Sequence, residues 1–243
     1  MRNYETRFTV KETLVNLIFP RRCPVCDEIV PAGEGLICRQ CQPRPQYIIE
    51  PRCRRCGKQL TGDTGLFCRD CTQRRHVFDY GYALYDYQSM QKSIYRFKYG
   101  GRCEYAMFYA QEIYRRLWDE ICMMHADSII PIPVHQSRLR SRGYNQAGLV
   151  AAELSKLIGI PVYEHLVQRI KKTIPQKELN IQERQNNLKK AFNISADVVK
   201  LNKTILIDDI YTTGSTLDAV ALELKKQGVE SVYFITLCIG EGI

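Results

Sequence analysis

The chain has 243 residues, of which 45% are hydrophobic and 25% are charged, a composition that excludes the disordered and fibrous classes and is typical of a globular protein. No apolar run approaches the roughly 20 residues needed to cross a bilayer, and the first residues lack the basic-then-apolar order of a signal peptide, so we expect a cytoplasmic protein without stable membrane insertion. The formal net charge of +9 favours an anionic partner without choosing between a nucleotide and a nucleic acid.

Residues 1–19 predict a short amphipathic helix, because Val10, Leu14 and Leu17 recur at helical spacing. We expect this helix to pack on its own protein. Attachment to a membrane surface is an alternative, which the short apolar stripe and the missing basic face disfavour.

An internal repeat follows, built from two cysteine-rich units thirty residues apart. Each unit holds two Cys-x₂-Cys pairs separated by eleven residues, and the heptapeptide that begins at Gly35 returns almost unchanged at Gly65. Paired knuckles of this kind place four sulfurs around a tetrahedral Zn²⁺, and thiols in a cytosolic protein are not expected to form disulfides. We predict two structural Zn²⁺ ions, held by Cys23, Cys26, Cys38 and Cys41 and by Cys53, Cys56, Cys68 and Cys71.

Two alternatives stay open for these cysteines. The first and third knuckles could share one metal in an interleaved arrangement, or the thiolates could hold an iron–sulfur cluster. Four cysteines leave no open coordination position, so we do not expect catalysis at these metals. Eight thiolates and two Zn²⁺ ions would lower the formal charge from +9 to +5. The chain then divides into a zinc-ribbon module at residues 1–76 and a second domain at residues 77–243.

The second domain has the alternating pattern of an α/β protein. An aromatic strand is predicted at residues 78–87, helices at 90–99 and 106–117, a buried strand closed by prolines at 128–134, and a further helix at 147–158. Tyrosine is abundant in this region. In a folded domain we expect these tyrosines in the core and its rim rather than stacked on nucleobases.

The connection from residue 135 to residue 146 is basic. Arginine presents a planar fork of donors that suits a pyrophosphate or a nucleic-acid backbone. A solvated basic turn is the alternative. The candidate contacts are Arg138, Arg140, Arg142 and Asn145. The polar segment 165–192 is long for a connection within a domain, so we expect either a mobile functional loop or a short helix on the rim.

A buried strand at residues 204–207 ends on the adjacent carboxylates Asp208 and Asp209, and a loop of small residues leads into a helix at 217–224. The helix N-terminus offers unpaired N–H groups and a positive dipole end, and Gly214 allows close backbone approach, so a phosphate fits there. Ionised carboxylates can only accept hydrogen bonds, so they do not bind a phosphate directly. Their partners at such a site would be ribose hydroxyls or a cation such as Mg²⁺. The candidate phosphate-binding residues are Thr212, Thr213, Gly214, Ser215 and Thr216.

Residues 205–216 resemble the diphosphate-sugar motif of type I phosphoribosyltransferases, which binds phosphoribosyl diphosphate (PRPP). The resemblance implies that Asp208 and Asp209 hold the ribose 2′- and 3′-hydroxyls and that residues 212–216 hold the 5′-phosphate. An ordinary turn between a strand and a helix is the structural alternative. The glycine patterns of P-loop and dinucleotide-binding proteins are missing.

Further segments extend the resemblance over nearly the whole chain. They are the two cysteine units, Phe97-Lys98-Tyr99, the run from Arg138 to Gln146, Thr173-x₂-Gln176 with Arg184 and Asn187, and the acidic motif. Together they resemble the ComF family of competence proteins, of the ComFC type. The resemblance implies an α/β fold with a mostly parallel, phosphoribosyltransferase-like sheet flanked by helices and an N-terminal Cys₄ zinc-ribbon module.

The resemblance also implies a role in natural transformation, in which the protein handles single-stranded DNA beside a helicase-like competence partner. The site would be retained for PRPP or a ribose 5-phosphate-like ligand. An active PRPP-dependent phosphoribosyltransferase of unknown acceptor, with Mg²⁺ accompanying PRPP, is one alternative. A PRPP-sensing regulator is another. The sequence names no catalytic residue, no acceptor and no oligomeric state.

Overall fold

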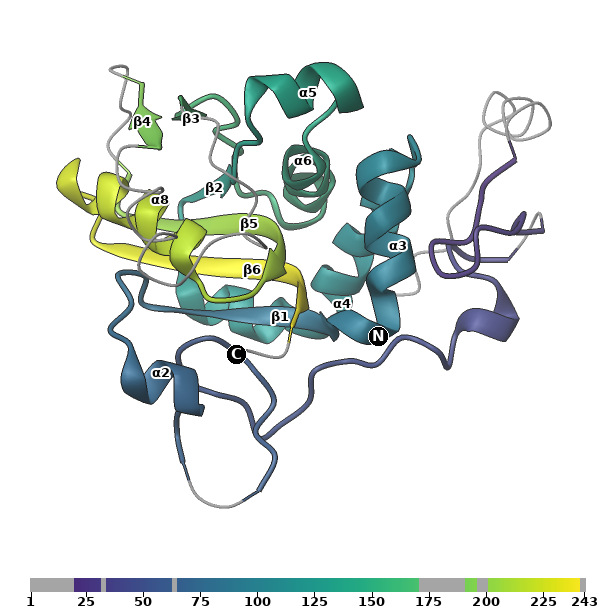
Figure 1. Cartoon of the computed structure of the whole chain (residues 1–243), viewed down its shortest axis with the longest axis horizontal. Coiled ribbons are helices and arrows are strands. Elements are labelled where there is room, and N and C mark those ends of the chain that lie inside the picture. Colours follow the sequence, from purple (N-terminus) through teal and green to yellow (C-terminus); the bar gives the residue numbers. More distant parts are fainter. Residues whose placement is uncertain (1–19, 32–33, 63–64, 171–190, 196–200, 241–243) are drawn as a thin grey trace.

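A four-stranded parallel sheet forms the centre of the molecule, seen here in a computed structural model that describes residues 20–31, 34–62, 65–170, 191–195 and 201–240 (Figure 1). The strands lie in the order β1 (Tyr80–Asp86), β6 (Ser231–Ile239), β5 (Lys203–Tyr211) and β2 (Ser128–Pro131). Each neighbouring pair is parallel. The predicted parallel sheet flanked by helices is therefore confirmed.

Both faces of this sheet are covered, which explains why its central strands read as continuous apolar runs. Ile205, Leu206 and Ile207 of β5 are fully buried, and successive side chains of a strand point to opposite faces. Ile205 and Ile207 belong to one hydrophobic core, whereas Leu206 belongs to another. The sheet thus separates two cores.

Three helices cover the first face of the sheet, namely α3 (Tyr87–Tyr99), α4 (Tyr105–Met124) and α6 (Gln146–Ile158). The side chain of Asp86, the last residue of β1, accepts hydrogen bonds from two N–H groups in the first turn of α3, at 2.8 and 3.3 Å. Such a cap satisfies donors that a helix start leaves unpaired. The chain therefore passes from strand to helix without an intervening loop.

The second face is covered by α8 (Ser215–Lys226) and by a small antiparallel sheet of β3 (Val167–Arg169) and β4 (Phe192–Ile194). Leu217 and Val220 of α8 are buried against this face. The short antiparallel pair was not predicted from the sequence. It stands beside α8 in Figure 1.

The two cysteine units lie on opposite sides of the sheet. The first unit includes the 3₁₀ helix η1 (Arg39–Cys41), and its Val25 and Ile37 pack on the core of the first face. The second unit includes α2 (Arg69–Gln73) and joins the other core through Cys53 and Cys56. The pair of units therefore straddles β1, the edge strand of the sheet.

The linker between the units pairs with this edge strand. Tyr47 forms an antiparallel bridge with Tyr85 of β1, and the N–H of Asp86 donates to the carbonyl of Gln46 at 2.8 Å. The Tyr47 hydroxyl donates to Glu112 of α4 at 2.5 Å. Backbone groups that an edge strand would otherwise expose are thus paired by the chain itself.

Several elements differ from the sequence-based expectation. The strand predicted at 128–134 ends at Pro131, and the basic connection after it contains the helix α5 (Gln136–Arg142) instead of a continuous loop. The predicted helix at residues 1–19 and most of the polar segment 165–192 lie outside the described residues. Among the described helices, none is both long and apolar enough to cross a membrane.

Candidate functional site

Each cysteine unit gathers its own four sulfur atoms, with all Sγ atoms of a unit within 4.8 Å of one another. The Sγ atoms of Cys26 and Cys38 lie 3.8 Å apart, and those of Cys56 and Cys68 lie 3.6 Å apart. Tetrahedral Zn²⁺ with Zn–S bonds of about 2.3 Å requires sulfur separations of about 3.8 Å. The donors therefore fit one Zn²⁺ per unit, and the interleaved arrangement of knuckles is not adopted by the described cysteines.

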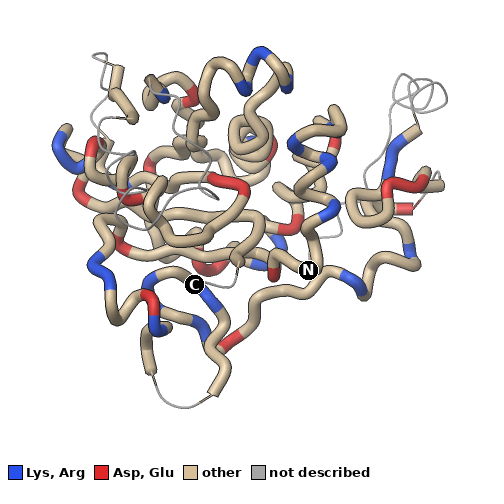
Figure 2. Tube along the Cα trace, viewed as in Figure 1, with Lys and Arg blue, Asp and Glu red and all other residues tan. Residues whose placement is uncertain are grey.

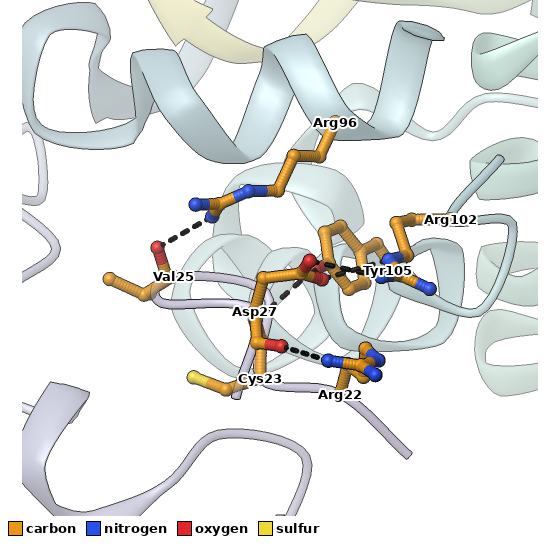
Figure 3. Close-up of polar contacts among 7 residues, drawn as sticks. All are labelled: Arg22, Cys23, Val25, Asp27, Arg96, Arg102 and Tyr105. Carbon is orange, nitrogen blue, oxygen red and sulfur yellow. Dashed lines mark hydrogen bonds and ion pairs between the residues drawn. The ribbon is translucent and has the colours of Figure 1, made fainter. Parts of the chain in front are cut away.

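The first ribbon is held on α3 and α4 by charged hydrogen bonds, shown in Figure 3. Asp27 follows the first knuckle and accepts from Arg102 Nε and Nη2 at 2.8 and 2.9 Å and from the Tyr105 hydroxyl at 2.7 Å. Arg96 of α3 donates to the carbonyl of Val25 at 3.1 Å. Burial alone would raise the pKa of Asp27, but the hydrogen bonds from Arg102 and Tyr105 outweigh it and lower that pKa.

The segment after the second ribbon contacts α8, the helix that follows the predicted phosphate loop. His76, whose side chain is 2% exposed, places Nδ1 2.8 Å from Asp218 Oδ2 in α8. The other carboxylate oxygen of Asp218 accepts from the N–H of Val77 at 2.7 Å. The His76 ring also stacks on Phe78. A zinc-binding unit and the helix behind the phosphate loop are thus joined by one side-chain pair.

The loop before α8 has the backbone geometry that an anion requires. Gly214 is the N-cap of α8 with a φ of +72°, and no described side chain caps this helix start. The first N–H groups of α8 therefore keep their donors available. Of the hydroxyl residues, Thr212 is exposed, and Thr213 Oγ1 lies 2.8 Å from Ser215 Oγ.

Asp208 and Asp209 end up in different environments, although they are adjacent in β5. Lys98 of α3 forms an ion pair with Asp209, with Nζ 2.8 Å from Oδ1 and side chains 17% and 19% exposed. Asp208 Oδ1 accepts from the N–H of Asp209 at 2.8 Å. By total residue exposure both aspartates are half-buried, and the carboxyl group of Asp208 is placed deeply enough for burial to affect its charge.

The pKa of Asp208 is raised to about 7, mainly by burial and next by the neighbouring carboxylate of Asp209. Lys98 and Arg169 act against this shift. Arg169 comes from β3, on the small antiparallel sheet, and its pKa is lowered by burial and by Arg138. Asp208 therefore changes its charge near neutral pH, at a point that basic residues of α3 and β3 reach.

The basic connection forms a helix beside this point. Arg138 and Arg140 are exposed, and Arg142 Nη1 donates to Gln146 Oε1 at 2.8 Å. Asn145 Nδ2 donates to the carbonyl of Ile132 at 3.1 Å. Its Oδ1 is buried without a hydrogen-bond partner among the described residues.

A pocket of about 490 Å³ lies between α5 and the β3 strand. Its lining includes His135, Asn145, His165 and Arg169, but neither aspartate of β5. Arg169 thus lies between the pocket and the carboxyl end of β5.

The sequence indicated the polar loop and the arginines. It gave no sign that Arg169 and Lys98 would face Asp208 and Asp209, because residues of separate elements carry no common local pattern.

Family models match segments in both halves of the chain. A model described as a double zinc ribbon domain matches residues 14–72, and a model described as a phosphoribosyl transferase domain matches residues 140–241. The zinc-ribbon match agrees with the two Cys₄ clusters. The phosphoribosyltransferase match includes β5, α8 and the loop between them.

Three curated relatives are similar in sequence. "Competence protein F" of Haemophilus influenzae is 40% identical over 108 residues, which is 44% of this chain and 47% of the relative. "DNA utilization protein YhgH" of Salmonella typhi is 32% identical over 46% of this chain and 49% of the relative. "Competence protein ComFC" of Bacillus subtilis is 29% identical over 60% of this chain and 58% of the relative.

The aligned region spans about half the length of the first two relatives, 47% and 49% respectively. Both halves of the present fold nevertheless have a matched family model, and competence proteins are among the relatives. The chain thus combines a matched double zinc ribbon with a matched phosphoribosyl transferase domain, and it is similar in sequence to competence proteins of the ComF and ComFC type.

Proposed function

We propose that the protein handles single-stranded DNA during natural transformation and that its Asp208–Thr216 segment binds PRPP or a ribose 5-phosphate-like ligand. The names of its relatives, which refer to competence and to DNA utilization, support the biological role. The geometry before α8 carries the ligand proposal, since Gly214 at positive φ opens a helix start that no described side chain caps.

The proposed roles follow from the chemistry of each group. Residues 212–216 donate hydroxyl and backbone hydrogens to the 5′-phosphate. Asp209, which forms an ion pair with Lys98, accepts from one ribose hydroxyl, and Asp208 accepts from the other when it is charged. Mg²⁺ would accompany a diphosphate and offset its charge.

The two zinc ribbons act as structural supports in this proposal. The second ribbon fixes α8 through His76 and Asp218, and the first ribbon fixes α3 through Arg96. Each Zn²⁺ ion would be bound by four thiolates and would stabilise the fold without taking part in catalysis. A helicase-like competence protein is the partner that the family resemblance suggests.

A transformation assay in a host that depends on this protein tests the combined role. We expect D208N/D209N and C53S/C56S each to abolish transformation, whereas the exposed carboxylate variant D119N retains it. Zinc content and thermal unfolding of purified D208N/D209N must match the unmodified protein. Full transformation by a folded D208N/D209N variant would contradict a role for the ribose-phosphate site.

Ligand binding and turnover are separated by two further measurements. Calorimetry with PRPP and Mg²⁺ should show binding that D208N/D209N removes. If pyrophosphate is also released when a panel of bases is added, the protein is an active phosphoribosyltransferase, which its intact motif favours. Binding without release under any acceptor would support the ligand-sensing alternative.

A further inference from the structure

Two tyrosines of α3 are exposed as a pair. Tyr95 and Tyr99 are 64% and 60% exposed, and their ring centroids lie 5.1 Å apart. They are the exposed members among the described tyrosines, because every other described tyrosine is buried or half-buried. The general expectation that tyrosines belong to the core and rim therefore holds for the others and fails for this pair.

An arginine extends the pair. The guanidinium of Arg142, at the end of α5, lies over the ring of Tyr99 with its Cζ 4.7 Å from the ring centroid. Gln146 holds the same guanidinium through a 2.8 Å hydrogen bond from Nη1 to Oε1. Three flat groups from two elements thus lie in one row, with the two tyrosine rings tilted by 47°, and the arginine is oriented before any ligand arrives.

The two helices that carry this row hold basic residues and no acidic ones. α3 contains Lys92, Arg96 and Lys98 and no acidic residue, and α5 contains three arginines and no acidic residue. Figure 2 shows basic positions on both helices. A surface of this kind attracts a polyanion whose flat groups are accessible.

A second aromatic pair, in α4, has a half-buried tyrosine, an exposed tryptophan and a different charge environment. Tyr114 and Trp118 of α4 have the same spacing, with ring centroids 5.2 Å apart, and Trp118 is 41% exposed. Asp119 and Glu120 follow directly in the sequence of α4. That pair has the rings without the uniform positive charge, so it provides a matched control.

We propose that Tyr95, Tyr99 and Arg142 form a stacking platform for the nucleobases of single-stranded DNA, with Arg138 and Arg140 contacting its phosphates. The inference rests on the proposed function and assigns the DNA contact within it. Bases of a single strand can lie on aromatic rings and on guanidinium planes, whereas a duplex keeps them stacked on each other. The same helix α3 carries Lys98, so the platform lies on the element that also reaches Asp209.

Fluorescence anisotropy with labelled oligo(dT) and with a duplex of equal length tests the platform on the zinc-loaded full chain. We expect Y95A/Y99A to weaken oligo(dT) binding about tenfold or more, and Y95F/Y99F to stay within about twofold, because stacking needs the ring rather than the hydroxyl. R142K should weaken binding although it keeps the charge. Y114A/W118A should leave the affinity unchanged.

The salt dependence distinguishes stacking from charge. R138A/R140A should reduce the slope of log affinity against log salt by about 1.4, since each phosphate contact on a single strand contributes about 0.7. Y95A/Y99A should lower the affinity without changing that slope. If the unmodified chain binds oligo(dT) and Y95A/Y99A binds equally well, the platform is wrong and the proposed function stands. If the unmodified chain fails to bind oligo(dT) at low salt, both are wrong.

Discussion

Asp27 of the first zinc ribbon is the acceptor of a bidentate pair of hydrogen bonds from Arg102, at 2.8 and 2.9 Å. Asp27 has a φ of +68°, a backbone conformation that asparagine and aspartate adopt more readily than other non-glycine residues. Asp27, which directly follows the zinc-binding residue Cys26, therefore determines where the ribbon contacts α4. Both the backbone and the charge of Asp27 contribute to that contact.

Replacing Asp27 with asparagine separates these contributions, because asparagine keeps the left-handed backbone and loses the charge. We expect D27N to lower the free energy of unfolding by about 1–3 kcal/mol, the range for hydrogen bonds to charged groups. Urea unfolding measures the change. E223Q removes an exposed ion pair with Lys226 and should cost at most about 1 kcal/mol. Equal losses in the two variants would argue against a stabilising contact between Asp27 and Arg102.

Paired cysteine variants distinguish the two ways of sharing the metals. With one Zn²⁺ per unit, C23S/C38S damages one site and C23S/C53S damages both. We therefore expect C23S/C38S to retain one zinc ion and C23S/C53S to retain none, as measured by metal analysis of the purified proteins. An interleaved arrangement predicts the reverse result.

Gly214 cannot be replaced without disturbing the phosphate loop. A Cβ at this position would lie 2.9 Å from the Tyr211 hydroxyl and 3.1 Å from His76 Cε1. We expect G214A to lose more than about 2 kcal/mol of stability, because the strain of a positive φ adds to these contacts, and to lose PRPP binding. Gly228 also has a positive φ, +95°, but a Cβ there meets nothing within 4 Å. Calorimetry should show normal PRPP binding by G228A.

Stability should depend on pH through Asp208. Its pKa of about 7 in the folded chain lies above the unfolded value of 3.8, so between these values the folded state holds more protons than the unfolded state. The free energy of unfolding therefore falls as pH rises through this window. We therefore expect the free energy of unfolding of D208N, minus that of the unmodified chain, to increase by about 1–3 kcal/mol from about pH 5 to about pH 8.

Urea unfolding of the ligand-free protein across this range provides the measurement. D119N changes an exposed carboxylate of α4, and its difference from the unmodified chain should stay constant with pH. A D208N difference that is equally flat would mean that Asp208 is ionised throughout and that burial does not control its charge.

Local patterns predicted the two cysteine clusters and the loop before α8. The spacing of the eight cysteines contains the information for both metal clusters, because each knuckle is formed by four consecutive residues. Gly214 and its hydroxyl neighbours likewise lie within one short loop before one helix. The roles proposed for Asp208 and residues 212–216 stay predictions.

Contacts between distant elements could not be predicted in the same way. The sequence treats Asp208 and Asp209 as equivalent, whereas the fold pairs Asp209 with Lys98, 111 residues away, and surrounds Asp208 differently. The helix α5 was missed for another reason. Prolines before it and Gly143 after it suggest a loop, although the His135 side chain caps its start and Gly143 ends it at a φ of +83°.

The antiparallel bridge between Tyr47 and Tyr85 limits how the protein can be divided for study. A fragment that begins after the ribbons would leave one side of β1 without its backbone partners. The unpaired N–H and C=O groups of such an edge strand can pair with strands of other molecules. We expect that fragment to self-associate, so its failure to act would reflect aggregation rather than a missing metal. Point variants of the cysteines and of Asp27 are the sounder way to assign work to the amino-terminal module.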